Sequence, residues 1–416
     1  MSNIKGMAET PKHAPMNQFE VADNCLRIGG QPLGDIARRV GNTPFYAYDR
    51  TVMRSQVEQL RAALPAEIHL HYAMKANPMP EVVRYLAGIT EGLDVASAGE
   101  LKVALEAGAK PANISFAGPG KSDADLQAAV DSGVIINMES NAEMLRIAAL
   151  AEGQPIRPRV AIRINPDFEL KSAGMKMGSG PKPFGVDAEC VPAMLETLGT
   201  LPLEFMGFHI FSGSQNLREQ AIIEAQTKTF ELAFRLAQFA PSPVRWLNIG
   251  GGLGVPYFPG EQRLDLASIG ANLSSLIETA QEKLPGAEIV MELGRYLTAE
   301  AGIYVCEVVD RKVSRGQTFL ITNGGLHHHL AASGNFGQII RKNYPLCLGN
   351  RISADDMEMV NVVGPLCTPL DVLGNKVILP RAGPGDLIVV FQSGAYGFSA
   401  SPKDFLSHPH PTEILL

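Results

Sequence analysis

The sequence has few cysteines, and they are scattered along the chain. Its 416 residues include five, and no two of these stand in a Cys-x-x-Cys pair. This pattern suits reduced thiols and argues against a disulfide framework or a zinc site built from cysteine pairs. The five cysteines are Cys25, Cys190, Cys306, Cys347 and Cys367.

Long apolar runs and an excess of positive charge are also lacking. No stretch reaches the run of about 18 apolar residues that suggests a membrane span, and the N-terminus has no basic region followed by an apolar core. Neither a span nor a signal peptide is predicted. The net charge is −7 and the pI about 5.8, which argues against a nucleic-acid-binding protein. We expect a cytoplasmic enzyme without nucleic-acid or membrane partners.

The chain does contain a regular alternation of short apolar runs with helical patterns. Helices are expected, for example, over 98–107, 122–131, 141–151 and 215–237. Eight strand–helix units in succession predict an α/β fold, a closed (β/α)8 barrel (TIM barrel) whose active site lies at the carboxyl ends of its strands. The expected strands are 68–75, 92–96, 114–117, 134–138, 159–164, 205–211, 244–249 and 288–292.

The chain is too long for one barrel, and the alternation stops after Glu292. Beyond it, runs with strand character are separated by turn sequences such as Ala-Gly-Pro-Gly-Asp. We predict a disordered tail over 1–16, a segment over 17–40 that contributes to the second domain, a barrel over 41–296 and a β-rich domain over 297–416. The strands expected in that domain are 303–309, 318–322, 359–363, 375–379 and 387–392.

Lys75 ends the first predicted barrel strand, inside an apolar stretch. Burial lowers the pKa of a lysine, and the free amine that results can form a Schiff base with an aldehyde. Taken alone, such a lysine is more often a solvated surface residue. Its predicted neighbours favour the chemical interpretation, because several of them suit one ligand.

Three consecutive glycines, Gly250, Gly251 and Gly252, follow the seventh predicted strand. Bare backbone N–H groups at this place in a barrel often bind phosphate, although a glycine cluster is as often a tight turn. A dinucleotide site would instead have its glycines in an early strand–helix unit, with an acid about 20 residues further on. We therefore favour a phosphate site.

Glu292 ends the eighth predicted strand, and Arg295 follows three residues later. A carboxylate can hold a pyridine nitrogen protonated, and an arginine can clamp a phosphate. His209, at the end of the sixth strand, could stack on a flat ring. With Lys75 this set indicates pyridoxal 5′-phosphate. A surface ion pair and a core histidine are the alternatives.

Seven motifs stand in a fixed order along the chain: Tyr72-Ala-Met-Lys75-Ala-Asn, Leu93-Asp-Val-Ala-Ser-Ala-Gly-Glu100, Phe208-His-Ile-Phe-Ser-Gly-Ser-Gln215, Gly250-Gly-Gly-Leu-Gly, Glu292-Leu-Gly-Arg295, Gly364-Pro-Leu-Cys-Thr-Pro-Leu-Asp371 and Gly394-Ala-Tyr396-Gly. This set resembles the motifs of the fold-type III PLP-dependent decarboxylases, the ornithine/diaminopimelate decarboxylase family, from about residue 40 to residue 405. The resemblance implies an alanine racemase-like barrel followed by a β-rich C-terminal domain.

The resemblance also implies roles for individual residues. Lys75 would carry the cofactor, and Asp94 would lie near the Schiff base. Cys367 would reach the active site of a partner subunit, because this family builds its sites across a head-to-tail homodimer; the residues alone favour a buried core thiol. The implied catalytic set is Lys75, Cys367, His209 and Asp94, and the implied cofactor-binding set is Lys75, His209, Ser212, Gly250, Gly251, Gly252, Glu292, Arg295 and Tyr396.

The implied reaction is loss of the α-carboxylate of an amino acid, after which Cys367 or Lys75 returns a proton to Cα. A diaminopimelate decarboxylase is one alternative. A racemase on the same fold is another, and the Gly-Pro-x-Cys setting of Cys367 argues against it. A non-catalytic relative that binds regulators or stores the cofactor is the third.

Departures from the family pattern concern the substrate. No Arg-Pro-x-x-Tyr run follows Gly325. Thr368 stands after Cys367, at the position where members of the family have an acid that binds the distal ammonium of the substrate. The variant Cys-Thr-Pro-Leu-Asp run, the 171–183 insertion and the C-terminal tail resemble most the subgroup associated with exosortase gene clusters and with carrier-protein-linked decarboxylation. The substrate would then lack a free distal ammonium; alternatively, the insertion is only a solvated loop. The substrate-binding candidates are Asp371, Thr368, Arg341 and Tyr344.

Three consecutive histidines, His327, His328 and His329, raise the question of a metal site. Consecutive side chains of an extended segment point to alternate faces, so three of them do not converge readily on one ion. We expect no metal.

Overall fold

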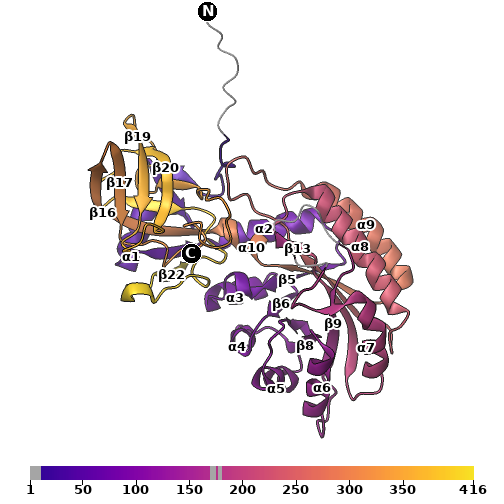
Figure 1. The fold of residues 1–416 in the computed structure, drawn as a ribbon. Helices are drawn as coiled ribbons and strands as arrows, with labels where there is room; N and C mark the ends of the chain where they lie inside the picture. The colour runs from indigo at the N-terminus through magenta and orange to yellow at the C-terminus, as the bar shows by residue number, and fades with distance from the viewer. Residues whose placement is uncertain (1–10, 169–174, 177–179) are drawn as a thin grey trace, which may run out of the picture.

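The computed structural model describes residues 11–168, 175–176 and 180–416. Figure 1 shows a barrel ringed by helices, with a second, β-rich domain at its side. Eight parallel strands close the barrel, because β15 pairs with β5 and β8 pairs with β9. These strands are β5 (Ile68–Ala73), β6 (Gly92–Val95), β7 (Ile114–Phe116), β8 (Ile135–Met138), β9 (Arg159–Asn165), β12 (Glu204–Ile210), β14 (Trp246–Gly251) and β15 (Glu288–Leu293). The predicted (β/α)8 fold is confirmed.

Serine caps start several of the outer helices directly after the strands. Ser97 and Ser140 accept from backbone N–H groups in the first turns of their helices, and Ser122 forms a capping box with Asp125. Each cap satisfies a helix N–H that would otherwise lack a partner. The barrel helices are α2 (Arg50–Ala63), α3 (Pro80–Ala87), α4 (Ala98–Glu106), α5 (Asp123–Ser132), α6 (Asn141–Leu150), α7 (Val191–Leu198), α8 (Glu219–Ala237) and α9 (Leu266–Lys283).

The interior of the barrel is divided into an apolar and a polar layer. Paired residues on neighbouring parallel strands point to the same side, so the register identifies the side chains that share the interior. The apolar layer is a separate buried cluster of Ile135, Ala161, Trp246 and Val290. Nearer the carboxyl ends lies a polar layer made of His71, Asp94, Ser115, Asn137, Arg163, His209, Asn248 and Glu292.

The second domain is built on one sheet of eight strands. Its order is β18-β21-β16-β17-β19-β20, with β4 on β16 and β22 on β4. All five strands expected after the barrel are present in it. Its strands are β4 (Phe45–Tyr48), β16 (Gly302–Ser314), β17 (Gln317–Thr322), β18 (Leu346–Leu348), β19 (Met357–Val363), β20 (Val372–Pro380), β21 (Leu387–Val390) and β22 (Thr412–Leu415).

The N-terminal part differs from the expected division. The predicted barrel begins at residue 41, whereas β4 hydrogen-bonds to β16 and β22 of the second sheet. The segment 17–40 forms a small sheet of its own, β1 (Val21–Ala22), β2 (Cys25–Ile28) and β3 (Gln31–Pro32), followed by α1 (Leu33–Val40). It meets the second domain where Leu26 N donates to Gly349 O over 2.8 Å.

The predicted disordered tail is only partly described. Residues 1–10 lie outside the described residues, as does most of the 171–183 insertion. Residues 11–16 are packed on the barrel: Ala14 is buried, and the Lys12 carbonyl accepts from Gly260 N over 2.8 Å. Among the described helices, none combines the length and apolarity that crossing a membrane requires.

Candidate active site

A cavity of about 280 Å³ opens at the carboxyl ends of β5, β14 and β15. Its lining brings together five residues expected at the site: Lys75, Gly252, Glu292, Arg295 and Tyr396. An adjoining recess is lined by three others, Ser212, Gly250 and Gly251, and shares Gly252 with the cavity. The strand ends thus gather side chains that are far apart in the sequence, as barrel geometry requires.

Lys75 and Glu292 form an ion pair at the floor of this cavity. Lys75 lies in the 3-10 turn η1 (Met74–Ala76) that ends β5, and its Nζ is 2.6 Å from Oε1 of Glu292 on β15. Partial burial acts to lower the pKa of Lys75, but Glu292, assisted by Tyr396 and Asp94, outweighs it and raises that pKa above its ordinary value. The expectation of a lysine with a lowered pKa is therefore wrong for this arrangement, because it left the partner carboxylate out.

Glu292 also faces His209 from β12. The Nε2 of His209 lies 3.3 Å from Oε2 of Glu292, and the imidazole is almost completely buried. Burial lowers the pKa of His209, with Glu292 opposing the shift. Burial also opposes ionisation of Glu292, but Lys75 and His209 together hold its pKa well below the usual range. At neutral pH the site therefore holds a lysine cation, a carboxylate anion and a neutral imidazole.

The glycine run at the end of β14 packs too closely for any other residue. A Cβ at Gly251 would collide with the Glu292 carbonyl, and one at Gly252 would collide with the Gly213 carbonyl. Gly250 and Gly252 also have positive φ angles, 67° and 79°, which favour glycine. The loop therefore presents bare backbone to the cavity and its recess, a fit for an anionic group such as a phosphate.

Arg295 stands at the start of α10 (Arg295–Thr298), on the cavity wall. Its guanidinium carbon lies 4.6 Å from the Tyr396 ring centroid, and its Nη1 donates to the Tyr257 hydroxyl over 3.0 Å. Tyr396 has a positive φ of 57°, and its N–H donates to the Ala76 carbonyl over 2.8 Å, beside Lys75. Unusual backbone of this kind is often found where a functional side chain must be aimed.

Asp94 lies in the polar layer below this cavity, on β6. Its Oδ1 accepts from the Ser115 hydroxyl, and its Oδ2 has no partner among the described residues. Burial, followed by the nearby Glu292 charge, raises the pKa of Asp94 well above its usual range. Burial therefore favours the neutral form of this carboxyl group in the cofactor-free protein.

The residues expected to bind substrate do not line the cavity in the described part of the chain. The Asp371 carboxylate is buried and accepts from Leu326 N over 2.6 Å and from Leu366 N over 2.8 Å. Arg341 donates to the carbonyls of Ser333 and Val372 over 2.9 and 2.6 Å. Asp371 and Arg341 thus hold loops in place, and their contacts leave little to offer a substrate.

The other two candidates and Cys367 are also outside the cavity wall. Tyr344 is buried behind Tyr257, with ring centroids 4.8 Å apart. Thr368 is half-buried and accepts from Leu370 N over 3.3 Å. Cys367 is exposed, not a core thiol.

Two of the three histidines contact each other, and the third has partners of its own. His327 contacts His328 and His408, whereas His329 pairs with the Ser393 hydroxyl over 2.9 Å. Burial lowers their pKa values to about 3, 4 and 3. Within the described ranges, no group of three or more histidine, cysteine or acidic side chains could hold a metal ion.

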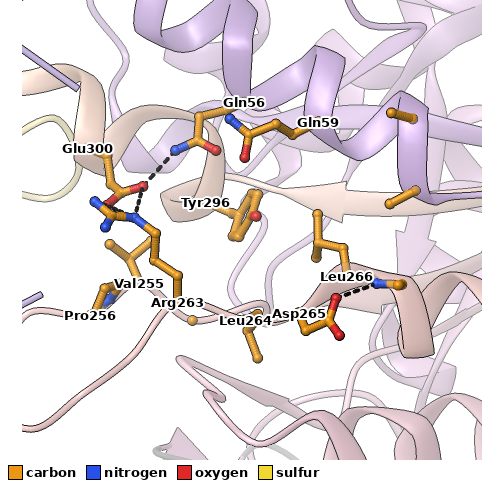
Figure 2. Close-up of a pocket in the computed structure, with 14 residues that line it drawn as sticks. Gln56, Gln59, Val255, Pro256, Arg263, Leu264, Asp265, Leu266, Tyr296 and Glu300 are labelled. Carbon is orange, nitrogen blue, oxygen red and sulfur yellow. Dashed lines mark hydrogen bonds and ion pairs between the residues drawn. The ribbon is translucent and has the colours of Figure 1, made fainter. Parts of the chain in front are cut away.

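A second cavity, of about 360 Å³, lies behind Tyr296, which lines both cavities. Figure 2 shows Arg263 2.7 Å from the Glu300 carboxylate and Gln56 donating to the same carboxylate over 2.7 Å, whereas Asp265 accepts from a backbone N–H. These contacts tie α2 to the 255–263 loop. We therefore regard this cavity as a structural junction.

Sequence reasoning missed several parts of the site. Phe336 lines the cavity from the second domain, and Tyr257 accepts from Arg295. His71, four residues before Lys75 on β5, enters the polar layer beside Asp94. Only His71 gave a signal that could have been used, since alternation along the predicted strand 68–75 places His71, Ala73 and Lys75 on one face.

Residues 50–299 match the family described as pyridoxal-dependent decarboxylase, pyridoxal binding domain. The chain is 41% identical over 379 residues to the L-glutamyl-[BtrI acyl-carrier protein] decarboxylase of Niallia circulans, covering 90% of this chain and 88% of that protein. It is 31% identical over 401 residues to diaminopimelate decarboxylase of Aquifex aeolicus, covering 96% and 92%. The crystal structure of Helicobacter pylori diaminopimelate decarboxylase with L-lysine superposes with a TM-score of 0.82 at 28% identity, covering 92% and 94%.

Proposed function

This chain belongs to the pyridoxal-dependent decarboxylase family, and from that premise we propose that it removes the α-carboxylate of an amino-acyl unit tethered to a carrier protein. The observation that carries the proposal is the 41% identity, over 90% of this chain, to a decarboxylase whose substrate is bound to an acyl-carrier protein. The neutral Thr368 after Cys367 supports it, because no acid stands there for a distal ammonium. Decarboxylation of free diaminopimelate is the second candidate, favoured by the similarity to diaminopimelate decarboxylases.

The residues of the cavity fit pyridoxal 5′-phosphate. When bound, this cofactor supplies an electron sink that takes up the electron pair left by the departing CO2. Lys75 is the amine available for covalent attachment of the cofactor. Glu292, an anion at neutral pH, is suited to hold a ring nitrogen protonated, and the buried neutral imidazole of His209 is suited to stack on a ring. Arg295, Tyr396, Ser212 and the Gly250–Gly252 loop would hold the phosphate.

Cofactor binding would change the partner of Lys75. In the cofactor-free protein its ammonium group neutralises Glu292 across 2.6 Å. With Glu292 engaged by the cofactor, Asp94 would be the remaining acid of the polar layer whose pKa responds to Lys75. Asp94 would then stabilise positive charge on the lysine nitrogen.

A second copy of this chain would complete the site. Cys367 is exposed and lies outside the cavity wall of its own chain, although Phe336 of the same region lines that wall. Exposed apolar side chains are close to both in the sequence: Ile339 and Ile340 follow Phe336, and Leu370 follows Cys367. Asn335 Nδ2 donates to the Leu370 carbonyl over 3.2 Å, which joins the two loops into one face. Such a face marks an interface, and we propose a homodimer in which Cys367 enters the partner site and returns a proton to Cα.

The test is CO2 release from an L-glutamyl-loaded acyl-carrier protein compared with free glutamate, diaminopimelate, ornithine, lysine and arginine. We expect turnover of the carrier-bound unit and little of the free amino acids, with Lys75→Ala as the inactive control. Rapid decarboxylation of any free diamino acid would exclude a tethered substrate. Inversion at Cα without CO2 release would show a racemase instead.

A further inference from the structure

The strand before Lys75 carries a buried histidine that no part of the proposed reaction uses. His71 lies on β5, in register with Glu292 on one side and with Gly92 on the other. Its side chain is 2% exposed, and neither ring nitrogen has a hydrogen-bond partner among the described residues. Two unpaired polar atoms in a barrel interior are costly, so a role that gives at least one of them a partner is expected.

The ring of His71 is fitted into its place by the neighbouring strand. A Cβ at Gly92 would collide with the Asn113 carbonyl oxygen and would lie 2.5 Å from both Cε1 and Nε2 of His71, so glycine at 92 leaves room for the Asn113 backbone and for the imidazole. Asp94 follows two residues later on the same strand and on the same face. The fit therefore fixes the imidazole beside the Asp94 carboxyl group.

The two side chains are close and complementary. The His71 Nδ1 lies 4.0 Å from Oδ2 of Asp94, which is about 1 Å longer than a hydrogen bond. This Oδ2 is the carboxyl oxygen without a partner, because Oδ1 already accepts from Ser115. A shift of about 1 Å would bring Nδ1 of His71 into hydrogen-bond distance of Oδ2 of Asp94. The carboxyl group would then be held at both oxygens, by His71 and by Ser115.

We propose that His71 is a positioning residue, which donates from Nδ1 to Oδ2 of Asp94 and so holds that carboxylate toward the nitrogen of Lys75 once the cofactor is attached. This inference rests on the proposed function of the Lys75 site. A donor at Oδ2 favours the anionic form of Asp94, and the anion in turn favours positive charge on the lysine nitrogen. His71 thus acts on the cofactor through Asp94, without touching it.

The charged surroundings of His71 are consistent with a neutral donor. The titratable groups that face it are His69 on its own strand, Glu91 before β6, Asp94 on β6 and Glu292 on β15. Burial lowers the pKa of His71 to about 4, so the imidazole carries one N–H at neutral pH. The positioning role therefore does not depend on protonation of His71 above about pH 5.

The test is a pH titration of the absorbance band of the lysine-bound cofactor in His71 variants. His71→Leu keeps the side-chain volume similar but removes the N–H donor. We expect the midpoint of the pH titration of the band to fall by about one pH unit, and kcat to fall about tenfold with little change in KM. His71→Asn places an amide N–H where Nδ1 was and should restore the midpoint. His71→Gln, whose amide reaches the position of Nε2, should not.

The outcomes separate the alternatives. A His71→Leu protein with the wild-type midpoint would overturn the proposal, and so would an Asn variant as impaired as the Gln variant. If His71→Leu does not fold, the comparison of Asn with Gln decides alone. In a double-mutant cycle, adding His71→Leu to Asp94→Asn should shift the titration midpoint almost no further than Asp94→Asn alone. A wild-type protein that never develops the cofactor band would instead refute the proposed function.

Discussion

Replacing Glu292 with glutamine removes the anion that keeps Lys75 protonated. Two unit charges 2.6 Å apart attract by about 6 kcal/mol at an effective dielectric constant of about 20, but by only about 1.6 kcal/mol in water. Because the Lys75 side chain is 48% exposed, we expect a value near the lower limit, about 2 kcal/mol. This corresponds to a fall of about 1.5 units in the pKa of Lys75 in the cofactor-free protein.

The assay is the pH dependence of acetylation of Lys75, followed by mass spectrometry of the peptide that contains it. At pH 7 the fraction of free amine should rise about 30-fold in Glu292→Gln, since 1.5 pH units is that ratio. Decarboxylation should nevertheless become slower, because glutamine cannot hold a ring nitrogen protonated. The two effects have opposite signs: the lysine becomes more reactive toward the acetylating reagent while the enzyme becomes less active.

A matched control lies at the other end of the same strand. Glu288 is also half-buried, and its Oε1 is 2.8 Å from Nδ1 of His69. Glu288→Gln removes one charge from β15 without touching Lys75, so the acetylation profile of Lys75 should stay as in the wild type. An unchanged profile in Glu292→Gln as well would refute the argument that this ion pair controls the lysine.

Three further predictions concern the rest of the site. Burial raises the pKa of Asp94, so above about pH 4 the unfolded chain loses a proton that the folded protein keeps, and the stability of the folded protein falls as the pH rises. Asp94→Asn removes this pH-dependent loss, so it should raise Tm by about 2 °C or more at pH 7 but not at pH 3. Equal Tm shifts at both pH values would contradict this reasoning. The Cβ of Gly251→Ala would collide with a backbone carbonyl, so this variant should bind the cofactor poorly and lose about 2 kcal/mol of unfolding free energy. Gly120→Ala, whose Cβ would meet open space, is the control, and its unfolding free energy in urea should change by no more than about 0.5 kcal/mol. Cys367→Ala and Lys75→Ala proteins should each be inactive. When the two are mixed and exchange subunits, about a quarter of the wild-type activity should return. No recovery despite exchange would place Cys367 in the site of its own chain.

The barrel was predictable because its signals are local. Each strand is a short apolar run, and serine caps such as Ser97 and Ser122 mark the helix starts. The motifs around Lys75 and Glu292 also led to the family and to the cofactor, both of which the comparisons confirm. Which side chains gather at the cavity followed from one rule, that the carboxyl ends of parallel strands meet at one face.

What failed was information that depends on partners far away in the sequence. The pKa of Lys75 is decided by a carboxylate on the eighth strand, 217 positions further along the chain. β4 pairs with β16 and β22, which lie more than 250 residues further along the chain. The sequence of 45–48 alone does not identify these partners. Asp371 and Arg341 suited a substrate by charge, but loop carbonyls and N–H groups in their own chain already occupy them.

The most direct measurement of the central claim is reduction with borohydride after incubation with pyridoxal 5′-phosphate, followed by peptide mapping. We predict one stable label per chain, on Lys75, together with loss of CO2 release. A label on any other lysine, or a protein that decarboxylates its substrate after Lys75 is replaced by alanine, would contradict the assignment.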